Sequence, residues 1–351
     1  MNFTTTAASA QEASQQFPLT DLNGQSILIT GGTGSFGRAF VNFVTKRYSP
    51  RRLVIFSRDE LKQYEMQQSF DQSYLRYFIG DVRDADRLEM AMRDVDYVIH
   101  AAALKQVPTA EYNPFECVRT NIHGAENVVN AAIRSGVKRV VALSTDKATN
   151  PVNLYGASKL ASDKIFVAAN ALAGPRRTRF AVVRYGNVIG SRGSIVPLFE
   201  KLIASGASAL PITDKRMTRF FIAVDHGVKI VLSSLQMMSG GEVFIPKIPT
   251  VRIVDLAAAM MPGGKLESIG IRPGEKLHEM LISEDDARAT IELHDRYIIE
   301  PLFEFWEREH YDKLGSKKVK ENFCYASNTN EQWLDVSQIR ELLQRVKAEK
   351  Q

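Results

Sequence analysis

The sequence has little cysteine, no long apolar run and no cluster of histidines, and each scarcity excludes a class of protein. Its two cysteines, Cys117 and Cys324, lack the spacing of a metal site, and we expect reduced thiols in a cytoplasmic protein. The six histidines form no closely spaced pair, so a catalytic metal is not indicated. No stretch of about 18 consecutive apolar residues occurs, so we expect no membrane-spanning helix.

Positive charge is present but is not concentrated. The 351 residues carry a formal net charge of +5, and the lysines and arginines are dispersed, so nucleic-acid binding is not indicated. Apolar residues make up 44% and charged residues 24%, as in an ordinary globular enzyme with one large domain or two. Residues 1–20 are rich in Thr, Ala, Ser and Gln, lack a signal-peptide pattern and are expected to form a mobile tail.

A glycine-rich segment near the N-terminus has the pattern of a dinucleotide-binding turn. The apolar stretch Ser26–Thr30 predicts a strand before the glycines, and residues 38–46 predict a helix after them. Glycine permits a tight turn, close approach of the backbone to a pyrophosphate, and close packing of the helix. The helix N-terminus would then face the phosphates. The residues expected to bind the cofactor here are Gly31, Thr33, Gly34, Ser35, Phe36 and Gly37.

The end of the second predicted strand, Arg52–Ser57, favours NADP over NAD. An NAD site usually carries an acid at this strand end, which binds the ribose 2′-hydroxyl. Here Arg58 and Lys62 can pair with a 2′-phosphate, and Ser57 can hydrogen-bond to it. Asp59 is the contrary signal, and we expect it to cap the helix that begins there.

Strands and helices alternate along the rest of the first half. Further strands are predicted at residues 75–79, 96–100, 137–143 and 180–185, with a long helical stretch at 111–136. This alternation predicts an α/β fold with a doubly wound parallel sheet of the Rossmann type. Ligands of such sheets bind beyond the carboxyl ends of the strands. Additional cofactor contacts are therefore expected at Asp81, Val82, Ala101, Lys105 and Thr120.

Two pairs of titratable residues follow the fifth strand. Tyr155 and Lys159 are four apart and so lie on one face of a helix. An ammonium beside a phenol favours the phenolate, which can take a proton from a sugar hydroxyl while a nicotinamide takes the hydride. Asp146 and Lys147, preceded by Thr145, add a second acid and base that alcohol oxidation does not need. This surplus predicts a reaction of more than one step.

Residues 31–37 together with Tyr155 and Lys159 resemble the extended short-chain dehydrogenase/reductase family. Residues 184–188 and 272–275 are similar to those of its members that act on nucleotide sugars. Within the family, the chain from about residue 21 to residue 333 resembles the branch of configuration-inverting UDP-N-acetylglucosamine 4,6-dehydratases. The segments that carry this resemblance are 57–62, 100–105, 144–147, 216–220 and 332–334.

The resemblance implies a lyase that uses bound NADP and acts on UDP-N-acetylglucosamine. Tyr155, beside Lys159, would deprotonate the C4 hydroxyl while the hydride moves to NADP⁺. Lys147, which stands where retaining dehydratases usually carry glutamate, would remove the C5 proton, and Asp146 would protonate the leaving C6 hydroxyl. The hydride would return to C6, and a proton would return to C5 from the opposite face. The product would serve pseudaminic acid or a related surface sugar.

The resemblance also implies a UDP-sugar site in the second half of the chain. Asn187, Arg219 and Arg272 would contact the diphosphate and uridine, since an arginine fork pairs two phosphate oxygens at once. Glu275 would accept a hydrogen bond from a ribose hydroxyl. Further walls of this site would be formed by Lys105, Val196, Pro197, Thr213 and Met217.

The predicted organisation has a cofactor domain at residues 21–186 and a substrate lobe at 187–340, followed by a C-terminal tail at 341–351. Segments around 221–260 are expected to return to the cofactor domain. The resemblance further implies a homo-oligomer. Its dimer contact would form from the helices at 111–136 and 153–173, and relatives assemble further, into hexamers.

Three other functions stay open on the sequence alone. The first is another nucleotide-sugar dehydratase of the same fold. The second is a C4 epimerase, which needs Tyr155 and Lys159 but not the Asp146–Lys147 couple. The third is a non-catalytic NADP sensor, although such proteins commonly lose the tyrosine or the lysine.

Some features of the site are left undecided by the sequence. As a base, Lys147 needs a lowered pKa, which burial and the nearby cations Lys105 and Lys159 would favour and Asp146 would oppose. Gln106 and residues 326–330 depart from the family pattern, so their local hydrogen bonding is open.

Overall fold

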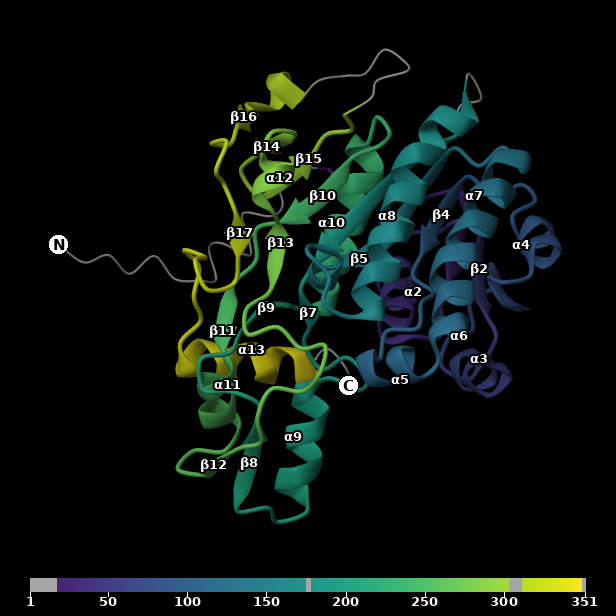
Figure 1. The fold of residues 1–351 in the computed structure, drawn as a ribbon. Helices are drawn as coiled ribbons and strands as arrows, with labels where there is room; N and C mark the ends of the chain where they lie inside the picture. Colours follow the sequence, from purple (N-terminus) through teal and green to yellow (C-terminus); the bar gives the residue numbers. More distant parts are fainter. Residues whose placement is uncertain (1–17, 175–177, 303–310, 349–351) are drawn as a thin grey trace.

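Buried runs of Val, Ile and Leu form the central sheet of the computed structural model, which describes residues 18–174, 178–302 and 311–348 (Figure 1). Within these ranges the sheet has ten strands in the order β16-β14-β15-β10-β6-β5-β4-β1-β2-β3. The strands from β3 to β10 in this order are parallel, and β15, β14 and β16 extend the sheet antiparallel. The bounds are β1 Ser26–Thr30, β2 Arg52–Ser57, β3 Leu75–Ile79, β4 Tyr97–His100, β5 Arg139–Thr145, β6 Arg179–Tyr185, β10 Val243–Pro246, β14 Thr290–Glu292, β15 Arg296–Ile299 and β16 Lys317–Lys318.

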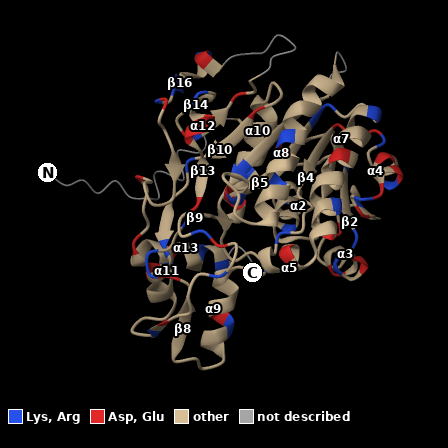
Figure 2. Cartoon of the chain, in the orientation of Figure 1, with Lys and Arg blue, Asp and Glu red and all other residues tan. Residues whose placement is uncertain are grey.

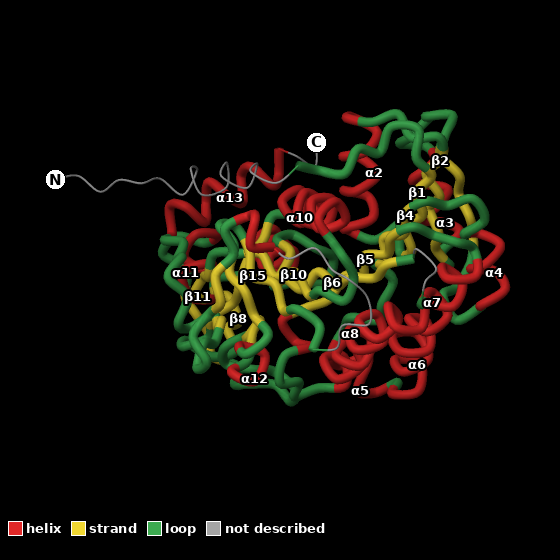
Figure 3. Tube along the Cα trace, turned by 90° about the horizontal axis from the view of Figure 1, so that it is seen from above, coloured by secondary structure: helices red, strands yellow, loops and turns green. Residues whose placement is uncertain are grey.

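Helices cover both faces of this sheet, as Figure 3 shows from above. Helices α2 (Ser35–Arg47) and α10 (Val224–Met237) pack together on one face. Helices α7 (Gly124–Arg134) and α8 (Leu154–Ala173) pack together on the other. The predicted α/β fold with a doubly wound parallel sheet is therefore confirmed. The shorter helices of this domain are α3 Glu60–Gln67, α4 Ala85–Ala91, α5 Val107–Tyr112 and α6 Pro114–Val118.

The helix predicted at 111–136 is interrupted. Helix α5 ends at Tyr112, and α6 starts with Pro114, because proline fits the first turn of a helix but not its interior. Between α6 and α7 the chain makes a π-helical turn at Arg119–His123. This turn buries Asn121, whose side chain accepts from the Leu104 amide at 2.8 Å and donates to its carbonyl at 2.9 Å. The turn therefore fixes the segment that follows β4.

A second hydrophobic cluster forms the smaller lobe, which lies beside the carboxyl ends of the parallel strands (Figure 1). Its sheet has the order β11-β9-β7, and helices α9, α11 and α13 pack around it. Two further strand pairs, β8 with β12 and β13 with β17, complete the described part of the chain. The bounds are β7 Asn187–Val188, α9 Ile195–Ala204, β8 Ala209–Ile212, β9 Thr218–Ile222, β11 Thr250–Arg252, α11 Ile253–Met260, β12 Lys265–Ser268, β13 Met280–Ile282, α12 Glu284–Ala287, β17 Tyr325–Ala326 and α13 Val336–Ala348.

The structure refines the predicted domain organisation. Residues 224–246 return to the central sheet as α10 and β10, but so do β14, β15 and β16, which were expected in the substrate lobe. Residues 341–348 do not form a tail, because they continue α13 and bury Leu342 and Val346 in the smaller lobe. The predicted N-terminal tail does not extend to residue 20, because Thr20 is buried and its hydroxyl donates to the Leu232 carbonyl at 2.9 Å. Residues 1–17 and 349–351, which make up the rest of the two predicted tails, lie outside the described residues.

Charged residues of both signs occur along the described chain. Figure 2 shows lysine and arginine interspersed with acidic residues over most elements. No helix in the described ranges is both long enough and apolar enough to cross a membrane.

Gly156, in the first turn of α8, is packed so closely that a larger side chain would not fit without a shift of the backbone. A methyl group at this position would overlap the carbonyl oxygen of Lys147 and touch Pro151. We expect Gly156→Ala to lower the free energy of unfolding by about 1–3 kcal/mol, because the backbone around Lys147 must shift. Denaturant unfolding measures this change.

The matched control is Gly227→Ala in α10, where the nearest atom to an added methyl group is 3.9 Å away. It should raise the free energy of unfolding by about 0.5–1 kcal/mol, since alanine favours a helix over glycine. Equal effects of the two substitutions would contradict the packing argument.

Candidate active site

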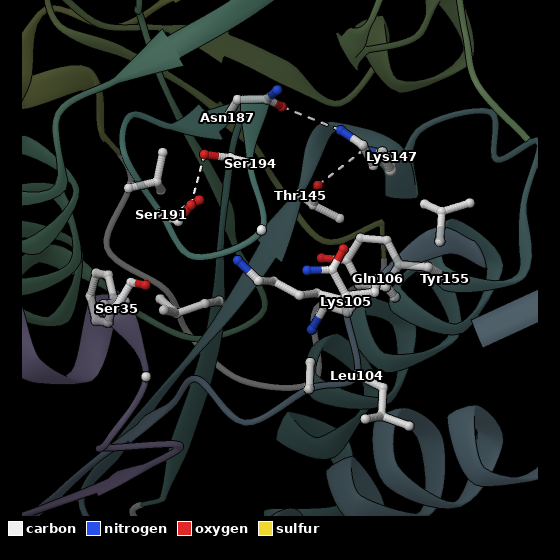
Figure 4. Close-up of a pocket in the computed structure, with 18 of the residues that line it drawn as sticks. Ser35, Leu104, Lys105, Gln106, Thr145, Lys147, Tyr155, Asn187, Ser191 and Ser194 are labelled. Atoms are coloured by element: carbon white, nitrogen blue, oxygen red, sulfur yellow. Dashed lines mark hydrogen bonds between the residues drawn. The ribbon is translucent and has the colours of Figure 1, made fainter. Parts of the chain in front are cut away.

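A cavity of about 730 Å³ lies where the carboxyl ends of the parallel strands meet the smaller lobe. Residues that follow β1, β2, β3, β4 and β5 line one side of it, and residues from the smaller lobe line the other. Figure 4 shows some of both, among them Lys105 and Lys147 from the first group and Asn187 from the second. The parallel topology brings these segments together although they are far apart in the sequence. All the predicted cofactor residues line this cavity: Gly31, Thr33, Gly34, Ser35, Phe36, Gly37, Ser57, Arg58, Asp59, Lys62, Asp81, Val82, Ala101, Lys105, Thr120, Tyr155 and Lys159.

The glycine-rich turn fits the phosphates of a dinucleotide. Gly31 has φ 65°, and a Cβ there would lie 2.9 Å from the backbone of Ala102. Gly34 is the N-cap of α2 and has no side chain that could accept a hydrogen bond from the first turn. The first N–H groups of the helix are therefore available to a phosphate. The buried hydroxyl of Thr120 also lines the cavity and has no partner among the described residues. These features suit a bound dinucleotide.

The corner after β2 carries two cations that already have acidic partners. Asp59 caps α3, as expected, by accepting from the Lys62 amide at 3.0 Å. Its carboxylate also pairs with the Lys62 ammonium, and this hydrogen bond holds the pKa of Asp59 below its ordinary value. Arg58 lies 3.7 Å from Asp81. A ligand phosphate at this corner would compete with these carboxylates for both cations.

Helix α8 places Tyr155 and Lys159 in the cavity wall, one turn apart. Burial raises the pKa of Tyr155 to about 12, because the charge of Lys147 and a hydrogen bond with Thr145 lower it by less. Burial also lowers the pKa of Lys159, against the opposing charge of Asp163. The expectation that Lys159 makes Tyr155 a phenolate is therefore not met in the free protein, where the phenol keeps its proton.

Lys147 is held by three oxygen acceptors. Its Nζ lies 3.0 Å from Asp146 Oδ1, 3.2 Å from Glu279 Oε1 and 3.3 Å from Asn187 Oδ1, and Figure 4 shows the contact with Asn187. Three acceptors match the three N–H donors of an ammonium. Burial lowers the pKa of Lys147, but the charges of Asp146 and Glu279 outweigh burial and raise it above its ordinary value. The charged form is the resting state.

Asp146 lies behind the cavity wall. Its side chain is 0% exposed, and it does not line the cavity, although Thr145 and Lys147 do. Thr145 Oγ1 donates to Asp146 Oδ1 at 3.0 Å, while Oδ2 has no partner within the described ranges. Burial and the charge of Glu279 raise the pKa of Asp146 in spite of Lys147. The group is therefore suited to hold a proton.

Glu279 is the functional candidate that sequence reasoning missed. Its side chain is 2% exposed and lines the cavity, directly against Lys147. The only sequence signal was its position four residues after Glu275, within a segment already assigned to the substrate. That spacing does not reveal a contact with Lys147, which is distant in the sequence.

Most predicted substrate residues line the cavity, but their partners differ from expectation. Arg219 donates to the carbonyls of Thr218, Leu277 and Lys276, and its Nε lies 3.6 Å from Glu279. Its guanidinium therefore braces the 276–279 segment. Arg272 pairs with Glu275 at 2.9 Å. The predicted substrate residues that line the cavity are Lys105, Asn187, Thr213, Met217, Arg219, Arg272 and Glu275.

Val196 and Pro197 are not part of the cavity lining. Both belong to α9, and Val196 is buried in the core of the smaller lobe because its side chain packs with that lobe's apolar cluster. Their neighbours Ser194 and Ile195 line the cavity instead. The prediction of this wall was therefore wrong by one or two residues.

Both departures from the family pattern make defined contacts. Gln106 lines the cavity, and its side-chain amide packs directly against Gly193. Ser327 accepts from the Glu279 amide at 2.9 Å. Asn330 donates to the Ile248 carbonyl at 2.9 Å.

Comparison with known proteins agrees with this geometry. A family model described as polysaccharide biosynthesis protein matches residues 27–301. The chain is 57% identical to "UDP-N-acetylglucosamine 4,6-dehydratase (inverting)" of Campylobacter jejuni, over 92% of this chain and 98% of the relative. It is 41% identical to a UDP-glucose 4-epimerase of Rickettsia canadensis, over 91% of this chain and 95% of the relative.

A solved structure, described as Pen from Bacillus thuringiensis, superposes with a TM-score of 0.85 at 37% identity, over 93% of this chain and 99% of that one. The chain therefore belongs to the polysaccharide biosynthesis protein family and has the extended short-chain dehydrogenase/reductase fold.

Proposed function

We propose that this protein is a configuration-inverting UDP-N-acetylglucosamine 4,6-dehydratase, a hydro-lyase that uses bound NADP. The observation that carries the proposal is the Asp146–Lys147 contact of 3.0 Å, next to a cavity that also contains Tyr155 and the glycine-rich turn. Simple oxidation of an alcohol needs the tyrosine but not this couple. The 57% identity to an enzyme of that name supports the choice of reaction and substrate.

The residues divide the reaction among them. A nicotinamide cofactor, when bound, would accept the hydride from C4 of the sugar and return it to C6. Tyr155 takes the proton of the C4 hydroxyl as a phenolate, which must form after the ligands bind because burial raises the pKa of Tyr155 in the free protein, and Lys159 on the same helix face stabilises its negative charge. The ketone at C4 acidifies the C5 proton, and Lys147 removes it. Asp146 supplies the proton that leaves with the C6 hydroxyl as water, and a proton returns to C5 from the opposite face when the hydride reaches C6.

Asp146 needs a path to the sugar because it does not face the cavity. Both of its hydrogen-bond partners, Thr145 and Lys147, line the cavity and contact its Oδ1 at 3.0 Å. A proton from Asp146 therefore reaches the cavity through one intervening group. The Asp146–Lys147 couple can also exchange a proton directly, which converts a charged pair into a neutral amine and a neutral acid.

The UDP portion would lie against the smaller lobe. Arg272 and Asn187 are proposed to contact the diphosphate and uridine, and Glu275 the ribose. Arg272 would leave Glu275, its partner in the free protein, when the diphosphate binds. Thr213 and Met217 would flank the uracil.

A C4 epimerase is the second candidate, favoured by the 41% identity to a UDP-glucose 4-epimerase. Epimerisation needs a bound cofactor together with Tyr155 and Lys159, and both residues line the cavity. It does not need a second acid and base. The role of Lys147 separates the two functions.

The purified protein should convert UDP-N-acetylglucosamine to a 4-keto-6-deoxy sugar without added reductant. NMR of the product formed in D₂O should show deuterium at C5 and inverted configuration there, because the returning proton comes from solvent. Retained configuration would contradict the role given to Lys147. Unchanged substrate would rule out the dehydratase.

Lys147→Ala should abolish dehydration, because no amine remains to remove the C5 proton. We expect a fall in kcat of about 10²–10⁴-fold, the usual contribution of a general base. If the protein is an epimerase, this variant keeps its activity and a C4 epimer accumulates in the NMR spectrum. Lys229→Ala, at a lysine on α10 outside the cavity lining, controls for loss of a surface charge.

Preference for NADP is proposed to depend on the cations after β2. Arg58→Ala should weaken NADP binding by about tenfold or more and change NAD binding little, since the lost contact is to a charged 2′-phosphate. Isothermal titration calorimetry with each dinucleotide measures the ratio. Arg134→Ala on α7, whose side chain pairs with Glu89, is the control. Equal losses for both dinucleotides would place Arg58 at another part of the cofactor.

We further propose a homo-oligomer built from dimers. The helices that the family resemblance implies for the contact, α6 to α8, expose Phe115 to 78% and Leu172 to 72%. Burial of such side chains in a partner would remove apolar surface from water.

The product would enter pseudaminic acid or related surface-sugar biosynthesis, which agrees with the family's description.

A further inference from the structure

Glu279 touches the proposed base, yet the reaction above gives it no role. We infer that Glu279 is a positioning residue whose charge sets the protonation of the Asp146–Lys147 couple. The inference rests on the proposed dehydratase function, because only that reaction uses the couple. Glu279 would act on the protonation of Lys147 and Asp146 and would not act on the sugar directly.

The geometry places two buried carboxyl groups against one ammonium. Glu279 Oε1 lies 3.2 Å from Lys147 Nζ, and Asp146 Oδ1 lies 3.0 Å from the same atom. Glu279 is 2% exposed and Asp146 0% exposed. The second oxygen of each, Oε2 and Oδ2, has no hydrogen-bond partner in the described part of the chain. Two unpaired carboxylate oxygens in one buried cluster are costly if both groups are ionised.

The surrounding charges decide which carboxyl group keeps a proton. Burial favours protonation of Glu279, but its cationic neighbours outweigh burial and lower its pKa. Burial and the charge of Glu279 raise the pKa of Asp146. Pairs of carboxyl groups whose environments separate their pKa values commonly divide acid and base roles in this way. The titratable and charged groups around the two carboxyl groups are Lys147, Tyr155, Arg219 and Lys276.

The backbone of Glu279 is fixed from two sides, so its charge has a defined place. Its amide donates to Ser327 Oγ at 2.9 Å, and the Ser327 amide donates to the Glu279 carbonyl at 2.8 Å. Ser327 Oγ also contacts Thr218 Oγ1 at 2.7 Å. Strand β13 continues directly from Glu279 and pairs with β17. Ser327, within the segment 326–330 that departs from the family pattern, therefore helps to hold the backbone of Glu279, and with it the carboxylate, in place.

Removal of the Glu279 charge should affect both members of the couple in the same direction. A nearby negative charge stabilises an ammonium and destabilises a second carboxylate, so it raises the pKa of each. Without it, both pKa values fall. The two limbs of the pH profile belong to the coupled pair, and both should therefore move to lower pH.

The test is the pH profile of kcat/KM for UDP-N-acetylglucosamine with the holoenzyme. In Glu279→Gln, which keeps the size and removes the charge, both limbs should move to lower pH by about one unit or more. Glu279→Asp keeps the charge, so it should lower kcat while the limbs stay in place. A Glu279→Gln profile that loses height without moving would overturn the inference and leave Glu279 a structural residue.

Glu275→Gln is the matched control, since it makes the same chemical change four residues away. It should raise KM for the nucleotide sugar because Glu275 is proposed to contact the ribose, and it should leave both limbs where they are. If Glu275→Gln moves the limbs equally, the effect is one of general charge and the inference fails.

A measurement on the unsubstituted cluster covers the case in which Glu279→Gln does not fold. Infrared difference spectra between the wild type and Asp146→Asn, recorded while the pH is lowered from 7, should gain the band of a protonated carboxylic acid from Asp146 before any such band from Glu279. Absence of that band would overturn the inference. If wild-type protein does not convert the sugar but the band is present, the proposed function fails while the charge assignment stands.

Discussion

The contact of the Lys147 ammonium with three oxygens joins the end of the central sheet to segments on the other side of the cavity. Lys147 follows β5 of the central sheet, while its partners Asn187 and Glu279 lie at the start of β7 and just before β13. Each contact is between 3.0 and 3.3 Å. Displacement of either lobe would leave a buried polar atom without its partner, at a cost of about 1–3 kcal/mol each. The relative position of sheet and lobe is therefore tied to the state of this lysine.

Local pattern predicted the sheet because its parallel strands are buried on both faces. Strands β1, β2 and β3 occupy the predicted residues, and β4, β5 and β6 agree within two residues at each end. Such strands are continuous apolar runs that stand out from their surroundings. Strands β14, β15 and β16 are two to four residues long and pair antiparallel at the sheet edge. Runs that short have no readable period, so the sequence could not place them.

The cofactor half of the cavity was predictable for a topological reason, and the protonation states were not. Residues after parallel strands must meet at one edge, so Gly31, Arg58 and Asp81 could be brought together without coordinates. The position of Glu279 depends on its bonds to Ser327 and on the pairing of β13 with β17, which are long-range contacts. The protonation of Tyr155 depends on how deeply α8 is buried. Neither the position of Glu279 nor the protonation of Tyr155 could be inferred from the local sequence.

The balance between burial and nearby charges explains why lysine in place of glutamate at position 147 changes more than the identity of the base. A glutamate at position 147 would add a third carboxylate to Asp146 and Glu279, whereas a lysine neutralises part of their charge. In the free protein the charges outweigh burial, so the amine is held as an ammonium. Once Asp146 carries a proton, one of the two charges that hold the ammonium is gone, and burial then acts against Glu279 alone. The basicity of Lys147 is thus decided by two carboxyl groups, Asp146 from its own motif and Glu279 just before the distant strand β13.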